Sequence, residues 1–168
     1  MKDRLTTARL DLRVFVPDDD QALHALFSDP KTHTIGSGPI TDLTQTQTWI
    51  ANRDAAFQRF GLAWYAVRLQ GSESLIGNCG MLRGRKTSEQ PEIGYEIAAS
   101  QRGHGYATEA ATAVVAECTR EGLQTIWATV RPNNVPSVRI VESLDFILAF
   151  SDVDDKGPLL HYSKSLNA

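Results

Sequence analysis

The chain has 168 residues, of which 42% are hydrophobic and 22% are charged. This length and composition predict one globular domain over residues 1–168 with a sizeable core, and they exclude a disordered or fibrous chain. The formal net charge of -3 and the pI near 5.8 argue against a general nucleic-acid surface, which normally carries a basic excess.

The N-terminus and the cysteines favour the cytoplasm. The opening MKDRLTTARLDLRVF has no apolar export signal, and no window approaches the roughly 20 apolar residues of a membrane span. Cys79 and Cys118 lie in apolar surroundings far apart in sequence, which favours buried free thiols over a disulfide. No metal site is expected, because the four histidines lack metal-ligand spacing with each other or with the cysteines: His24, His33, His104 and His161.

The first third of the chain predicts one strand and two helices. Residues 8–15 alternate apolar and polar side chains, as a half-buried strand does. Residues 17–30 begin with acidic residues and end in Ser-Asp-Pro, which favours a helix. In residues 41–61 the apolar side chains recur about every 3.6 residues, and the segment ends at Gly61. This pattern predicts a longer helix.

The middle of the chain predicts a three-stranded antiparallel meander. Residues 62–69 and 74–83 are apolar runs separated by QGSE, a hairpin turn signal. Residues 92–98 then supply the third strand. After this strand the spacing of the apolar residues becomes helical. Residues 107–118 form an apolar stripe of a helix that ends near Gly122.

The last third adds a strand over residues 124–130, a short helix over 133–146, and a closing hairpin of 146–153 with 159–166. The predicted fold class is therefore α/β, with a mixed, mostly antiparallel sheet of about seven strands flanked by about four helices. The helix after the meander should link two neighbouring parallel strands.

The turn between the third meander strand and its helix contains two glycines, Gly103 and Gly105. Glycines there let successive backbone N–H groups converge at a helix start, which binds phosphate well. Arg102 and His104 should add positive charge. An ordinary strand-to-helix turn stays an alternative. A dinucleotide motif is disfavoured because Thr108 replaces its third small residue, and no Gly-Lys-Ser/Thr follows for a P-loop.

The order of elements and the run SQRGHGYATEA resemble the acetyl-CoA-binding region of the GNAT N-acetyltransferase superfamily, whose pattern is Gln/Arg-x-x-Gly-x-Gly/Ala. The first position departs from this pattern, since it is Ser100. Four segments are similar, in order, to the ribosomal-protein-alanine acetyltransferase branch, which acts on protein N-termini or small amines. These are LTTARLDLRVFVPDDDQALHALFSDP, LIGNCGML, EIGYEIAASQRGHGYATEA and RPNNVPSVRIVESLDF.

The resemblance implies acetyl-CoA as co-substrate and assigns residues to hold it. Main chain near Ile97 and Ala98 would pair with the pantetheine arm, and Asn134 would hold the same arm. Backbone N–H groups of seven consecutive residues would hold the pyrophosphate: Arg102, Gly103, His104, Gly105, Tyr106, Ala107 and Thr108.

Two carboxylates of the third meander strand, Glu92 and Glu96, share parity and should face the same side. A strand with one solvent-exposed face, or an ion pair within the protein, would also account for the two glutamates. The resemblance favours Glu92 as the group that receives the amine proton, since desolvation can raise a carboxyl pKa into the range of a base.

The Asn-x-x-Ser of RPNNVPS supplies Asn134 and Ser137. The simpler interpretation makes Asn134 a helix N-cap and Ser137 a first-turn residue. The resemblance implies that Ser137 also protonates or solvates the departing thiolate. Asp145 replaces the glycine of the family's Leu-Gly-Phe and should adopt a left-handed turn.

Several other residues are weaker candidates for the acceptor side. Trp49, Trp64 and Tyr95 are expected mainly in the core, although aromatic side chains also line pockets. His33 and the loop over residues 32–40 are acceptor-site candidates. Residues 83–86, RGRK, are expected to form a solvated turn, or else to contact the coenzyme's 3'-phosphate or an acidic peptide.

The sequence is thus interpreted as an acetyl-CoA-dependent N-acetyltransferase that moves acetyl directly to a primary amine, without a covalent carrier. Its expected partners are acetyl-CoA and an amine acceptor, either a peptide N-terminus or a small molecule, with no nucleic acid or membrane, in a monomer or homodimer. The alternatives are a non-catalytic acyl-CoA-binding module and, less favoured, a different nucleotide-binding enzyme.

Overall fold

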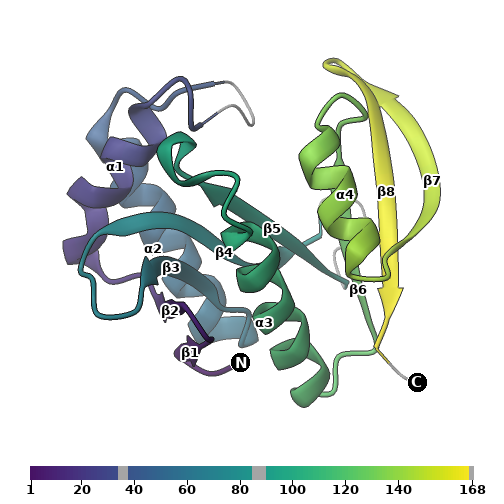
Figure 1. Cartoon of the computed structure of the whole chain (residues 1–168), viewed down its shortest axis with the longest axis horizontal. Helices are drawn as coiled ribbons and strands as arrows, with labels where there is room; N and C mark the ends of the chain where they lie inside the picture. Colours follow the sequence, from purple (N-terminus) through teal and green to yellow (C-terminus); the bar gives the residue numbers. More distant parts are fainter. Residues whose placement is uncertain (34–37, 85–89, 167–168) are drawn as a thin grey trace.

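The computed structural model describes residues 1–33, 38–84 and 90–166 (Figure 1). Within these residues eight strands form one sheet in the order β1-β2-β3-β4-β5-β6-β8-β7. The strands are β1 Arg4–Thr6, β2 Leu10–Val14, β3 Trp64–Leu69, β4 Leu75–Arg83, β5 Pro91–Ile97, β6 Thr125–Val130, β7 Ile147–Asp154 and β8 Gly157–Ser165. The helices are α1 Asp20–Ser28, α2 Leu43–Phe60, α3 Tyr106–Arg120 and α4 Val135–Ser143, with short 3-10 turns η1 Pro17–Asp19 and η2 Ala99–Gln101.

The predicted mixed α/β fold is confirmed, with one strand more than expected. The additional strand is β1, which pairs antiparallel with β2 through Leu5 and Leu12. Its three residues are too few for a periodic pattern, and only Leu5 among them is partly buried. The meander β3-β4-β5 is antiparallel, as predicted, and β7 with β8 forms the closing hairpin.

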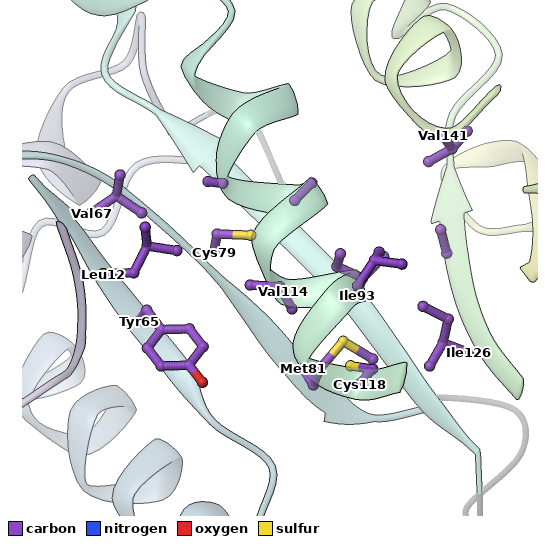
Figure 2. Packing of buried hydrophobic residues seen from close by; sticks show 14 of the residues in the cluster. Leu12, Tyr65, Val67, Cys79, Met81, Ile93, Val114, Cys118, Ile126 and Val141 are labelled. Atoms are coloured by element: carbon purple, nitrogen blue, oxygen red, sulfur yellow. The ribbon is translucent and has the colours of Figure 1, made fainter. Parts of the chain in front are cut away.

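The helices cover both faces of the sheet, each over its own apolar cluster. On one face the α3 side chains Ala111, Val114 and Cys118 pack on the strands (Figure 2). On the other face α1 and α2 enclose a smaller cluster that includes Phe27 and Trp64. This division gives β5 two different sides. Ile93, Tyr95 and Ile97 belong to the α3 cluster, whereas the alternate residues face the α1 and α2 layer.

Gly94 shows how closely the second layer approaches β5. A Cβ at this position would lie 2.5 Å from Cη2 of Trp64. The indole of Trp64 therefore rests directly on the β5 backbone, between the positions of Glu92 and Glu96. The absence of a side chain at Gly94 makes room for this ring.

The parallel neighbours β5 and β6 share one pair, Glu92 with Trp127, among the described residues. The helix α3 connects them, as predicted, and Figure 1 shows the two strands separating toward their C-terminal ends. Ala98 donates its N–H to Ile76 of β4 at 2.8 Å, so the main-chain groups of the alternate residue Ile97 point away from β4. The end of β5 thus presents backbone groups toward β6 that are not bonded to a neighbouring strand.

Helix ends follow their sequence signals. The Asp42 carboxylate accepts the N–H of Thr44 at 2.9 Å and caps α2, which ends at Gly61 with φ 67°. Asp145 has φ 60°, so the predicted left-handed turn after α4 is confirmed. Among the described residues no helix has the length and apolar character that a membrane crossing requires. In the same residues no group of three or more potential metal ligands occurs.

Candidate functional site

The start of α3 forms a backbone cradle. Gly103 and Gly105 have φ values of 82° and 80°, and Gly105 is the N-cap. The N–H of Glu109 bonds to the carbonyl of Gly105, so the N–H groups of Tyr106, Ala107 and Thr108 precede the first intrahelical bond. A Cβ at Gly103 would meet nothing within 4 Å, which leaves this side of the turn open. The geometry suits an anionic group at the positive end of the helix.

A clasp between the N-terminal segment and α3 holds this cradle. The guanidinium of Arg9 pairs with the Glu109 carboxylate at 2.6 Å and also donates to the carbonyl of His104 at 2.9 Å. The hydroxyl of Thr7 donates to the same carboxylate at 2.6 Å. Sequence reasoning missed this clasp, because its members lie about a hundred residues apart and no local pattern connects them.

The charges expected at the turn are arranged differently from the prediction. The Arg102 guanidinium donates to the carbonyls of Ile97, Lys31 and Thr32 at 3.1, 3.0 and 2.8 Å. Its charge therefore ties the segment after α1 to the end of β5 instead of extending the cradle. His104 is exposed and stacks on Tyr106 with ring centroids 5.4 Å apart, so it stays beside the cradle.

The main chain after β5 is only partly available to a ligand. Both main-chain groups of Ala98 bond within the protein, its N–H to Ile76 and its carbonyl to the N–H of Gln101, each at 2.8 Å. Ile97, in contrast, points its main-chain groups toward the side of β6. Its carbonyl already accepts from Arg102, so a ligand there would share or replace that contact.

The N-terminus of α4 is linked to β5 by one side chain. The Asn134 side chain accepts the N–H of Ser137 at 3.3 Å, so the N-cap role is observed. The hydroxyl of Tyr95 donates to the Ser137 carbonyl at 3.2 Å, which links β5 to α4. Burial raises the pKa of Tyr95, more than its bond to Ser137 lowers it, so the phenol stays protonated. Ser137 is half-buried, and its hydroxyl makes no hydrogen bond to the described residues.

Glu92 lies where β5 and β6 meet. Its side chain faces the α1 and α2 layer and is only 4% exposed. The Thr129 hydroxyl of β6 donates to Oε1 at 2.5 Å. Burial and the bond from Thr129 fix this carboxylate at the junction of the two strands.

Glu96 lies on the same face and pairs with His33. His33 Nδ1 is 2.9 and 3.2 Å from the two carboxylate oxygens. The Asn78 amide also donates to Glu96, at 3.5 Å, and accepts from the Trp64 indole at 3.0 Å. Strand parity predicted that Glu92 and Glu96 share a face, and the structure confirms it. It did not predict the partner His33, which is 63 residues away.

Two of the aromatic candidates, Trp49 and Trp64, lie in the α1 and α2 layer on the side of these carboxylates, whereas Tyr95 lies on the α3 side. Trp64 is buried and Trp49 is half-buried, with their rings 5.7 Å apart and perpendicular. The Arg53 guanidinium covers both rings at 4.6 to 4.8 Å. Of the remaining candidates, residues 34–37 and 85–86 lie outside the described residues, and Arg83 rests on the ring of Phe60 at 4.6 Å.

The site therefore combines an anion cradle, an open strand edge and buried carboxylates along one strand. A family model described as an acetyltransferase (GNAT) domain matches residues 9–147. The chain belongs to the GNAT acetyltransferase family. The match spans the cradle, both carboxylates and the start of α4.

Relatives of this GNAT enzyme cover most of its length. It is 29% identical over 146 residues to the uncharacterized N-acetyltransferase p20 of Bacillus licheniformis, which covers 86% of this chain and 82% of that protein. An acetyltransferase from Agrobacterium tumefaciens matches with a TM-score of 0.82 at 26% identity over 98% and 95% of the two chains. The ribosomal L7/L12 alpha-N-protein acetyltransferase RimL, solved with coenzyme A, matches with a TM-score of 0.84 at 18% identity over 96% of each chain.

The GNAT family uses acetyl-CoA as its co-substrate, and the residues present fit that group. The free N–H groups at the start of α3 suit a pyrophosphate, and the open edge of β5 suits an amide-bearing arm. The chain is therefore an acetyltransferase that takes its acetyl group from acetyl-CoA.

Proposed function

We propose that this GNAT enzyme transfers acetyl directly to a primary amine, either the α-amino group of a protein N-terminus or the amine of a small molecule. The observation that supports this proposal most strongly is the position of Glu92. It is a buried carboxylate at the pair that joins β5 to β6, while the anion cradle lies beyond the other end of β5.

The chain's own residues would hold acetyl-CoA along β5. Backbone N–H groups from Gly103 to Thr108 would bind the pyrophosphate, with Arg9 keeping the turn in place. The N–H of Arg102, which the sequence included in this set, bonds instead to the Ala99 carbonyl at 3.4 Å. The main chain of Ile97 would pair with the pantetheine arm, and Asn134 would keep the start of α4 beside it. The acyl thioester then supplies the electrophilic carbonyl carbon.

Glu92 would accept a proton from the nitrogen as the carbon–nitrogen bond forms. The half-buried Ser137 hydroxyl would protonate or solvate the departing thiolate. Neither role needs to be strong. An α-amino group has an ordinary pKa of about 7.7 to 8.0, so little help is needed to make it neutral. A thiol has an ordinary pKa of about 8.5, which makes the thiolate a fair leaving group.

The test measures thiol release from acetyl-CoA with two panels, peptides with free N-termini and small primary amines. Turnover on peptides that disappears when the N-terminus is blocked assigns a protein N-terminal acceptor. Turnover on small amines alone assigns a metabolite acceptor. Glu92→Gln should lower kcat by about 10- to 100-fold, at the weak end of general-base effects, and leave acetyl-CoA affinity unchanged.

A non-catalytic acyl-CoA-binding module is the competing function. The structure retains the cradle that such a module needs, so binding alone does not separate the two. Acetyl-CoA binding measured by calorimetry, together with silence across both panels, would favour the module. Binding that ATP or NAD blocks and coenzyme A does not would favour a different nucleotide ligand instead.

A further inference from the structure

His33 and Glu96 form a carboxylate–imidazole pair that the transfer scheme above leaves unused. The His33 side chain is 16% exposed and that of Glu96 is 6% exposed. An ionised carboxylate only accepts hydrogen bonds, so the contact to Nδ1 requires that this nitrogen carry the hydrogen. The other ring nitrogen, Nε2, is then a lone-pair acceptor whenever the imidazole is neutral.

Glu96 is itself held in place from behind. The Trp64 indole N–H donates to the Asn78 carbonyl oxygen, and the Asn78 amide donates to Glu96. All three residues are buried. A base whose partner is oriented by a third group is the usual arrangement for proton transfer by histidine.

Nε2 of His33 takes part in no hydrogen bond with the described residues, whereas Nδ1 contacts both oxygens of Glu96. The Phe27 ring flanks the imidazole with centroids 4.6 Å apart. Because the side chain keeps some exposure, Nε2 is the position from which it can reach an incoming group.

The segment that carries His33 is fixed to the end of β5. The Thr32 hydroxyl accepts the N–H of Ala99 at 2.8 Å, and the Thr32 carbonyl accepts from Arg102. Glu96 and Glu92 are four residues apart on one face, or about 13 Å along the strand. The two carboxylates therefore serve two successive positions rather than one atom.

We propose that His33, held by Glu96, removes the proton from the incoming ammonium group before the amine reaches the thioester. This rests on the proposed amine acetylation and adds to it. The ammonium gives one proton to Nε2 of His33, which releases it to solvent. The nitrogen lone pair then forms the carbon–nitrogen bond while the carbon–sulfur bond breaks. The second nitrogen proton goes to Glu92 and from there, through the Ser137 hydroxyl or solvent, to the coenzyme A sulfur.

Among the described residues, four charged groups lie near His33 or in its segment. Glu96 faces it from β5, Asp29 and Lys31 belong to its own segment, and Arg102 approaches from the residues after η2. Glu96 is the member in direct contact with the ring. The cations are engaged elsewhere in part, since Arg102 is bound by three carbonyls.

The decisive variant is His33→Asn. An Asn amide can still donate to Glu96 in the place of Nδ1, but it has no Nε2. The matched control is His24→Asn, since the His24 Nδ1 lies 3.0 Å from the Thr46 hydroxyl on the neighbouring helix and contacts neither carboxylate. Thermal unfolding and acetyl-CoA affinity should be unchanged in both variants.

The readout is kcat/KM for the amine as a function of pH. We expect His33→Asn to lose about 100-fold with a strongly basic amine at neutral pH. The loss should shrink at high pH and with a weakly basic hydrazide acceptor, because those acceptors arrive neutral. Glu92→Gln should instead lower kcat with both acceptors. An active enzyme in which His33→Asn behaves as His24→Asn does would overturn this proposal alone.

A second measurement does not depend on the acceptor. Nitrogen NMR of the neutral imidazole should show the hydrogen of His33 on Nδ1, and Glu96→Gln should remove that preference. A hydrogen on Nε2 would contradict the proposal even in an active enzyme. A chain that binds acetyl-CoA but acetylates no amine would instead remove the proposed function and this inference together.

Discussion

Gly103 and Gly105 occupy the left-handed region that other residues enter at a cost, and they do so where the backbone must face a ligand. Gly103 has open space around its missing Cβ. A side chain there is therefore limited by backbone strain and by the ligand, not by protein neighbours.

Gly103→Ala should cost about 1 to 2 kcal/mol of stability and weaken acetyl-CoA binding. Gly122→Ala is the matched control, since Gly122 has φ 75° and equally open surroundings, but it follows the other end of α3. Calorimetric titration should show a loss of affinity for the first variant only. Equal affinity in both would contradict the cradle.

Cys79 and Cys118 are both buried in the α3 cluster, where Figure 2 shows them among aliphatic side chains. Burial, and next the charge of Glu117, raises the pKa of Cys118 to about 12. The folded state therefore keeps a thiol that the unfolded chain ionises above about pH 8.5.

Two results follow for this thiol. Stability should be full below about pH 8.5 and fall as pH rises above it, because the unfolded state then binds fewer protons. Alkylation of the native protein at pH 8 should be slow and should accelerate with denaturant in step with unfolding. Fast labelling of the native state would show that the cluster opens locally.

Residue-level prediction succeeded where the signal was local. Strand parity placed Glu92 and Glu96 together, and Asp145 took the expected left-handed turn. Residue-level prediction did not foresee the contact between Glu96 and His33 or the one between Arg102 and Lys31. These contacts join segments whose relative position depends on the whole fold. Arg102 looked like a phosphate ligand from its neighbours in sequence, yet nearby carbonyls compete for the same charge.

At the scale of elements, the start of α3 depends on the segment before β2. Partial burial acts to raise the pKa of Glu109, but hydrogen bonds from Thr7 and Arg9 outweigh it and lower that pKa. The stabilisation from this clasp is therefore present above the ordinary glutamate value of about 4.3 and is lost as pH falls below it.

Arg9→Gln should loosen the cradle without touching the carboxylates of β5. We expect acetyl-CoA to bind several-fold more weakly, with a higher KM for acetyl-CoA and little change in kcat. Arg4→Gln is the control, because the Arg4 guanidinium pairs with Asp11 on the β1–β2 hairpin instead of with Glu109. A fall in kcat at unchanged KM would contradict the positioning role of Arg9.

Element prediction was most accurate where apolar periodicity was long. The helix α3 and the meander were placed within a few residues by their spacing of buried side chains. The strand β1 and the turn η2 were missed, because three residues carry no period. The turn η2 nevertheless sets the direction in which the chain leaves β5 for the cradle.

At the scale of the whole molecule, the sheet consists of two ladders that meet at Glu92 and Trp127. The first ladder runs from β1 to β5, and the second contains β6, β8 and β7. Few backbone hydrogen bonds cross this boundary in the described residues. Side chains add to the connection: Thr129 donates to Glu92, Trp127 donates to Gln90, and the Tyr95 hydroxyl donates to the start of α4.

We expect the sheet to open locally at this boundary between β5 and β6, which we call the seam. We expect amide hydrogens of β6 and β8 to exchange with solvent through a partial opening that leaves β3 and β4 protected. Acetyl-CoA lying along the seam would bind both parts in the closed arrangement only, so it should slow that exchange by mass action. Coenzyme A without its acetyl group should act almost equally well, since its pyrophosphate and arm make the bridging contacts. Bound acetyl-CoA would then hold the two ladders together during each turnover, and release of coenzyme A would let them separate again.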